Sequence, residues 1–280
     1  MRKSEWIFAS ASVIGKAHIT RNIPCQDYSK VQRFDNFSIA VVSDGAGSSE
    51  NSHIGSNKVC EYSLNYFENL VLNRGWNEQD NLPPKELWHE LAKQTLCLVK
   101  DDLDKFSMSN DLEYKSLSCT IILAIILPSG LLITHIGDGR AGYCDSNLNW
   151  NPLITPFHGE LANETVFITS DIWDESVIDE YIRSESIETD IKAFCLLTDG
   201  CENASFECNL FDQDKGIYFD PNRPFPLFFN PNLKILAQLN DQGMTEAEIN
   251  KLWEKFLEAG NDRLKNEMDD KTMILAISVS

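Results

Sequence analysis

The chain has 280 residues, 42% of them hydrophobic and 24% charged, which is typical of a globular protein with a sizeable core. Its net charge of -19 argues against nucleic acid as a partner, because a phosphate backbone requires a basic surface. The N-terminus has no apolar signal-peptide core and the 8 cysteines form no C-x-x-C pair, so we expect a cytoplasmic protein without a zinc site or a disulfide framework.

Apolar and β-branched runs predict strands along much of the chain. They lie at residues 6–13, 37–43, 118–127, 131–136, 140–144, 165–169, 193–198 and 272–279. Residues 117–136 carry no charge over 20 positions, which is also the length of a membrane span. Pro128, Ser129 and Gly130 interrupt this run with a turn signal, so a hairpin of two buried strands is the better interpretation and no membrane contact is expected.

Helical periodicity is present in three places, at residues 59–70, 88–106 and 249–257. The third opens on Thr245-Glu246-Ala247-Glu248, a capping box. Residues 221–231 are rich in proline and aromatic side chains and predict an irregular segment. Because the strands are clustered rather than alternating with helices, we expect antiparallel sheets with helices packed outside them.

Aspartates stand where several apolar runs end or begin. A single Asp-Gly pair after a strand is more typical of a plain turn than of a site. Here the arrangement recurs, and in a fold of two stacked sheets it would place several carboxylates around one end. The residues concerned are Asp27, Asp44, Asp138, Asp199 and the pair Asp269-Asp270.

Carboxylates crowded in this way repel one another unless a cation neutralises them. Oxygen ligands without a histidine or cysteine cluster favour Mg²⁺ or Mn²⁺ over zinc. Two such ions about 3.5 to 4 Å apart, sharing a carboxylate, can activate a water and hold a phosphoryl group. The pattern therefore predicts hydrolysis of phosphate esters.

The motifs, taken in order, resemble those of the metal-dependent protein phosphatases of the type 2C (PPM) family. The matching stretches are "QD", "SDGAGS", "LSCTIILAII", "IGDGRAGY", "LLTDGCEN" and "DDKTMILA", and they span about residues 8–279. "PCQDYS" and "ANETVFITSD" are similar to a bacterial subgroup. The resemblance implies an α+β fold, a four-layer αββα sandwich with two central antiparallel β-sheets flanked by helices, in one domain over residues 1–280.

The same resemblance implies a serine/threonine protein phosphatase that uses a water activated by two Mn²⁺ or Mg²⁺ ions. Its partners would be a phosphorylated protein substrate and a cognate serine/threonine kinase. Residues 201–231 would form a variable flap beside the site, where family members differ in the partners they select.

Roles for single residues follow from the resemblance by position. Asp44 would bridge the two ions, and the carbonyl of Gly45 would bind one of them. Asp199 and Asp269 would hold the other ion, with Asp269 rather than Asp270 matching the family's D-[DN]-x-T pattern. In the bacterial members the equivalent of Asp138 helps to bind a weaker third ion. Asp27 would hold a metal-bound water and act with Asp44 in catalysis.

The chain departs from the family pattern at two points. Gln26 stands where many relatives have glutamate, which removes one charge beside the bridging ion. The family's phosphate-binding arginine has no direct equivalent, and Arg21 and His18 are the candidates for phosphate binding.

Two other functions are compatible with the sequence. A phosphatase-like binding or regulatory module with little or no activity would be expected to lack one of the matched aspartates, yet Asp44, Asp199 and Asp269 are all present. A small-molecule phosphoesterase would share the same metal chemistry. Hydrolysis of a phosphothreonine peptide compared with that of nucleotides distinguishes it from a protein phosphatase.

Overall fold

Two antiparallel sheets of five strands each form the centre of the protein. The computed structural model describes residues 5–157, 165–188, 190–213 and 215–279. The first sheet has the order β1 (Glu5–Val13), β14 (Lys271–Val279), β9 (Ile191–Leu197), β6 (Arg140–Asp145) and β7 (Trp150–Pro152). The second has the order β2 (Tyr28–Arg33), β3 (Ser38–Ser43), β4 (Ile121–Leu127), β5 (Gly130–Ile136) and β8 (Arg183–Ile187).

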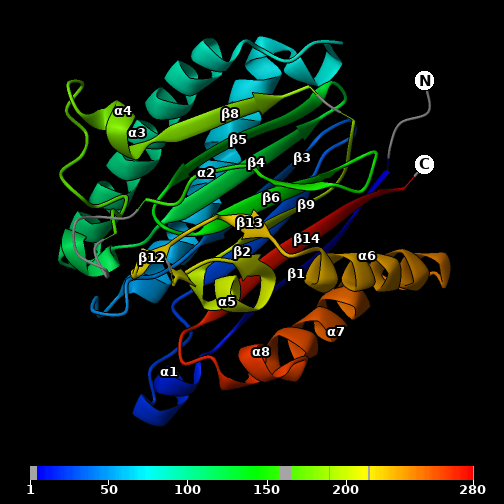
Figure 1. Cartoon of the computed structure of the whole chain (residues 1–280). Helices are drawn as coiled ribbons and strands as arrows, with labels where there is room; N and C mark the ends of the chain where they lie inside the picture. Colours follow the sequence, from blue (N-terminus) through cyan, green and yellow to red (C-terminus); the bar gives the residue numbers. More distant parts are fainter. Residues whose placement is uncertain (1–4, 158–164, 189, 214, 280) are drawn as a thin grey trace.

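Long helices cover the outer face of each sheet. Helices α2 (Ser52–Arg74) and α3 (Lys85–Ser109) pack on the second sheet, whereas α6 (Pro226–Asp241) and α7 (Glu246–Ala259) pack on the first (Figure 1). A third apolar layer lies between the two sheets. The expected αββα sandwich is therefore confirmed. The shorter elements are α1 (Lys16–Arg21), α4 (Ile178–Tyr181), α5 (Glu202–Ser205), α8 (Asp262–Asn266), β10 (Phe206–Glu207), β11 (Leu210–Asp212), β12 (Ile217–Phe219) and β13 (Arg223–Pro224).

Every residue of strand β4 is apolar, and the packing on its two faces explains why. Successive side chains of a strand point to opposite faces. Ile121 and Leu123 join the layer under α2 and α3, whereas Ile122 and Ala124 join the layer between the sheets. Both faces are covered, so all seven side chains are buried. The uncharged run is thus the hairpin β4–β5, and within the described ranges no helix is long and apolar enough to cross a membrane.

The prediction of an irregular segment at 221–231 is wrong for its second half, because α6 begins at Pro226. A proline at the first helical position needs no N–H, and Pro231 gives up one hydrogen bond inside the helix. Burial of Phe228, Phe229 and the leucines that follow against the first sheet compensates for that loss. Residues 226–231 of the expected flap consequently lie in a packed helix.

The strand predicted at 165–169 is also wrong. The backbone N–H of Phe167 donates to the hydroxyl of Ser170 over 3.0 Å, which turns the chain instead of extending it. Conversely, β2 was not predicted, because its sequence of Tyr, Ser, Lys, Val, Gln and Arg has no apolar alternation. It is an edge strand, where polar side chains are common.

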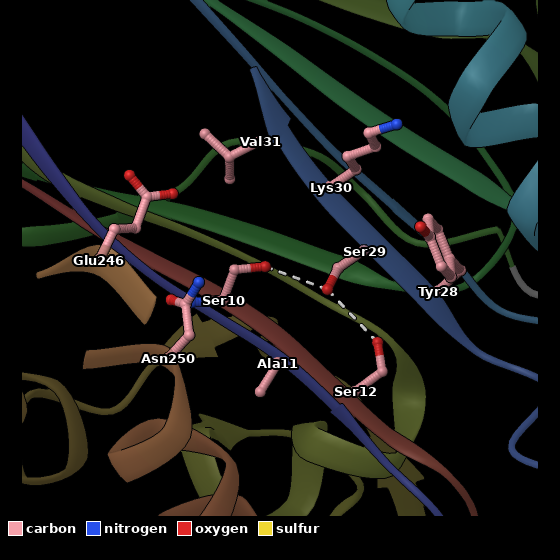
Figure 2. A pocket seen from close by; sticks show the side chains of 9 residues that line it. All are labelled: Ser10, Ala11, Ser12, Tyr28, Ser29, Lys30, Val31, Glu246 and Asn250. Carbon is pink, nitrogen blue, oxygen red and sulfur yellow. Dashed lines mark hydrogen bonds between the residues drawn. The ribbon is translucent and has the colours of Figure 1, made fainter. Parts of the chain in front are cut away.

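Strands β1 and β2 are each one of the two edge strands of their sheet and lie along one side of the sandwich. Between them is a polar groove of about 370 Å³. Figure 2 shows its centre, where the hydroxyl of Ser29 lies 3.0 Å from that of Ser10 and 3.3 Å from that of Ser12. Hydroxyl groups therefore join the two sheets here. Strand β1 leads into α1, and β2 begins directly after Asp27.

Candidate metal centre

Strand ends in the two sheets meet at one end of the sandwich. In the first sheet, the end of β9 is paired with the starts of β14 and β6. In the second, the end of β3 is paired with the start of β2. The Thr198 hydroxyl, just after β9, donates to Asp27 Oδ2 over 2.7 Å and so connects the two sheets. The aspartates that flank these strand ends are Asp27, Asp44, Asp138, Asp199 and Asp269.

Two glycines explain how the chain segments come so close. A Cβ atom on Gly45 would lie 2.4 Å from the carbonyl oxygen of Gln26, next to Asp27. A Cβ on Gly200 would lie 1.9 Å from the carbonyl oxygen of Asp270. Any side chain at these positions would push the neighbouring aspartate segments apart. The Asp-Gly pairs are thus more than turns, since the glycine allows one carboxylate segment to contact the next.

Threonines that the sequence analysis missed hold the aspartate segments in place. The backbone N–H of Asp44 donates to Thr120 Oγ1 over 3.0 Å, and Thr120 N–H donates to the Asp44 carbonyl over 2.8 Å. Thr198 holds Asp27, and its Oγ1 also accepts the N–H of Thr272 over 3.1 Å. Thr198 stands directly before Asp199 and Thr120 directly before β4, which was the available signal in the sequence. Their partners, however, lie far away in the sequence.

The carboxylates influence one another strongly. Burial raises the pKa of Asp44 well above its usual range, and the charges of Asp27, Asp199, Asp138 and Asp269 raise it further. The pKa of Asp199 rises to about 7, first by burial and then by the charges of Asp138 and Asp269. The pKa of Asp27 is also raised well above its usual range, again with burial as the largest cause. These five side chains therefore form one electrostatic cluster.

The cluster fits a divalent cation in its donor chemistry. Its side-chain donors are oxygens only, and Asp199 Oδ1 and Gln26 Oε1 are buried without a hydrogen-bond partner. Within the described ranges no three Asp, Glu, His or Cys side chains converge closely enough to enclose an ion by themselves. Mg²⁺ is usually held by one or two carboxylates together with waters, and backbone carbonyls can complete such a site. The residues present therefore suit an open site rather than a closed protein cage.

Without metal, the protein is expected to lose stability as the pH rises from about 4 to about 7. A carboxyl whose pKa is higher in the folded chain than in the unfolded one holds its proton better when folded, so stability falls as that proton is lost. For Asp199 the window runs from 3.8 to about 7. The expected loss for the cluster is on the order of 3 kcal/mol.

Thermal unfolding in excess chelator at pH 5 and pH 8 measures this loss. Mn²⁺ added at pH 8 should restore the unfolding temperature, because it replaces the missing protons. Equal or higher stability of the metal-free protein at pH 8 would contradict the clustering.

Asp269 and Asp270 have different surroundings. Both oxygens of Asp270 are engaged, since Oδ1 accepts the N–H of Gly15 over 2.7 Å and Oδ2 accepts that of Gln26 over 2.6 Å. His18 Nδ1 lies 2.9 Å from the same Oδ2. Asp269 is exposed, and its Oδ1 accepts only the N–H of Asp270. Asp269 is thus the one with capacity for a further ligand.

The two candidates for phosphate binding are placed differently. His18 is 6% exposed, and its Nδ1 lies 2.9 Å from Asp270 Oδ2. Arg21 is exposed at the end of α1 and forms no ion pair with a described carboxylate. Phosphate binding by either side chain stays a prediction.

Comparison with known proteins places this architecture in a family. The family model described as Protein phosphatase 2C matches residues 14–250. The chain belongs to the protein phosphatase 2C family. It is 27% identical over 281 residues to Serine/threonine-protein phosphatase 3 of Escherichia coli (strain K12). The aligned region covers 97% of this chain and 98% of that protein.

Solved structures share the fold of this phosphatase 2C chain. Serine/threonine phosphatase Stp1 from Staphylococcus aureus has a TM-score of 0.55 at 15% identity, over 99% of this chain and 96% of that one. RsbX in complex with magnesium has a TM-score of 0.52 at 13% identity, over 100% of this chain and 97% of that one. The predicted resemblance and fold are confirmed, and so is the expectation of a phosphoprotein phosphatase at the level of the family.

Proposed function

We propose that this protein removes phosphate from phosphoserine and phosphothreonine in proteins, using Mn²⁺ or Mg²⁺. The observation that carries the proposal is the cluster of five aspartates, from five separate segments, at one end of a phosphatase 2C sandwich. The E. coli relative named as a serine/threonine-protein phosphatase supports the substrate class, because it matches almost the whole chain.

The proposed ligands are the side chains of Asp44, Asp199 and Asp269 and the carbonyl of Gly45. Asp44 would contact both of two ions, and Asp138 would help to hold a weaker third. When bound, such ions would supply a nucleophilic water at neutral pH and neutralise charge on the phosphoryl group. Thr120 fixes the backbone of Asp44 on both sides, so its carboxylate is presented in one direction.

Asp27 is proposed to orient water beside these ligands. Thr198 donates to its Oδ2 over 2.7 Å, which fixes the orientation of this carboxylate. Gln26, in place of a glutamate, donates from Nε2 to the carbonyl of Ser49 over 3.2 Å. A glutamate could not donate there, so the glutamine suits this backbone and lowers the negative charge next to Asp27.

Substrate selection is assigned to the flap that was expected at 201–231. Its hairpin β11–β12 exposes five large apolar side chains, namely Leu210, Phe211, Ile217, Tyr218 and Phe219. Such side chains suit contacts with the protein around a phosphorylated residue. The net charge of -19 favours a basic substrate segment. A cytoplasmic location and a cognate serine/threonine kinase are proposed together with this substrate class.

Phosphate release from a phosphothreonine peptide, compared with release from nucleotides, tests the proposal. With Mn²⁺ the peptide should be hydrolysed at least about tenfold more efficiently, as kcat/KM, than any nucleotide. Faster nucleotide hydrolysis would instead identify a small-molecule phosphoesterase. Binding of the phosphopeptide without any hydrolysis would identify a phosphatase-like binding module.

A further inference from the structure

Arg140 has a fully buried side chain two residues after Asp138. Each of its three nitrogens donates to a different residue. Nε donates to Glu202 Oε2 over 2.8 Å, Nη1 to Asn222 Oδ1 over 2.8 Å, and Nη2 to Asp220 Oδ2 over 2.7 Å. The guanidinium also lies 5.7 Å from the centre of the Phe206 ring. An arginine is required for this geometry, since a lysine cannot direct three donors along a planar fork.

The partners of Arg140 lie at the two ends of one segment of the chain, residues 202–222. Glu202 begins α5, three residues after Asp199, whereas Asp220 and Asn222 follow β12. The hairpin β11–β12 lies between them in the sequence. Arg140 therefore connects the entry and the exit of the hairpin to the first sheet, at the point where β6 leaves the aspartate cluster.

The hairpin depends on its base for its position. The base is closed by the pairing of β10 with β13 and by a hydrogen bond of 2.8 Å from the N–H of Phe225 to the carbonyl of Ser205. Beyond the base, Tyr218 is 74% and Phe211 51% exposed, and these two rings pack on each other. A change in the base is thus expected to change where these side chains point.

Arg140 is also close to the metal-site candidates in electrostatic terms. The charge of Asp138 contributes to the raised pKa of Glu202, after burial and the opposing effect of Arg140. The charge of Glu202 in turn contributes to the raised pKa of Asp199. The guanidinium therefore offsets negative charge at the edge of the cluster while it holds the hairpin.

We propose that Arg140 is a positioning residue that fixes the hairpin 210–219 relative to Asp138 and Asp199, so that a phosphoprotein held by the hairpin is aligned with the aspartate cluster. The proposal rests on the phosphatase function proposed above. It predicts that loss of Arg140 separates two activities. Hydrolysis of a protein substrate needs the aligned hairpin, whereas hydrolysis of a small aryl phosphate does not.

The test compares three variants with the parent. Arg140→Met removes the cation but leaves Glu202 and Asp220 partly buried without it, which can impair folding. Arg140→Met/Glu202→Gln/Asp220→Asn removes all three charges and avoids that penalty. Arg33→Met is the matched control, because Arg33 also pairs with a carboxylate, that of Glu246, but is 38% exposed and lies on β2, outside the flap.

Two measurements are made on each variant with Mn²⁺ present. In the triple variant, kcat/KM for a phosphoprotein should fall at least about tenfold, while that for p-nitrophenyl phosphate stays within about threefold. Trypsin should cut after Lys215, in the hairpin, at least about tenfold faster than in the parent. The Arg33→Met control should match the parent in the ratio of the two activities.

An unchanged rate of cleavage at Lys215, or an equal fall in both activities, would overturn the positioning role. A parent that hydrolyses neither substrate would overturn the proposed function alone. In that case the cleavage rate at Lys215 would decide whether Arg140 holds the hairpin.

Discussion

Asp44→Asn is expected to lower the turnover of a phosphothreonine peptide at saturating Mn²⁺ by at least about a thousandfold. Asp44 is the proposed ligand of both ions, whereas Asp199 and Asp269 are each assigned to one. Asparagine keeps the size of the side chain but removes the charge that a shared ligand must supply. The measurement is phosphate release by Asp44→Asn and the parent, with Asp80→Asn, an exposed aspartate, as the matched control.

The fold of Asp44→Asn should survive this change. Burial, and then the charges of four neighbouring carboxylates, raise the pKa of Asp44, so its charge is unfavourable to the metal-free folded state. Metal-free Asp44→Asn should therefore unfold at the same temperature as the parent or higher. A folded variant with near-parental turnover would reduce "SDGAG" to an ordinary turn.

Asp270→Ala is expected to destabilise the protein by about 3 to 5 kcal/mol. The change leaves two backbone N–H groups, of Gly15 and Gln26, and the buried His18 without their carboxylate partner. These groups tie the starts of α1 and β2 to the start of β14. In thermal unfolding with chelator, the midpoint should fall by about 10 °C.

Asp269→Ala is the matched control for this prediction. Asp269 is exposed and accepts one local hydrogen bond, so its loss should change the metal-free stability little while weakening Mn²⁺ binding. The reverse pattern, with Asp269→Ala unstable and Asp270→Ala deficient only in metal binding, would exchange the roles of the two residues.

The sheet strands with strong patterns were predictable from the sequence. The hairpin β4–β5 could be recognised because both faces of each strand are buried and a Pro-Ser-Gly turn divides them. Helices α2, α3 and α7 were predicted at their centres, and the capping box of α7 is present. These features depend on local patterning, which a single sequence contains.

Other features depend on partners that are distant in the sequence. Helix α6 overrides its prolines because its phenylalanines are buried against the first sheet. The aspartates could be listed, but the contacts of Gly45 and Gly200 that bring their segments together could not. Arg140 was visible only as part of "GDGR", since its three partners lie 62 to 82 residues further along the chain.

The number of Mn²⁺ ions bound at saturation tests most directly whether these separate segments form one metal centre. Titration calorimetry on the parent at pH 7.5 should find at least about two ions per chain, and Asp44→Asn should lose the tightly bound pair. The phosphate released from a phosphothreonine peptide should rise with the occupied fraction. A parent that binds no Mn²⁺, or that retains full activity in excess chelator, would contradict the proposed centre.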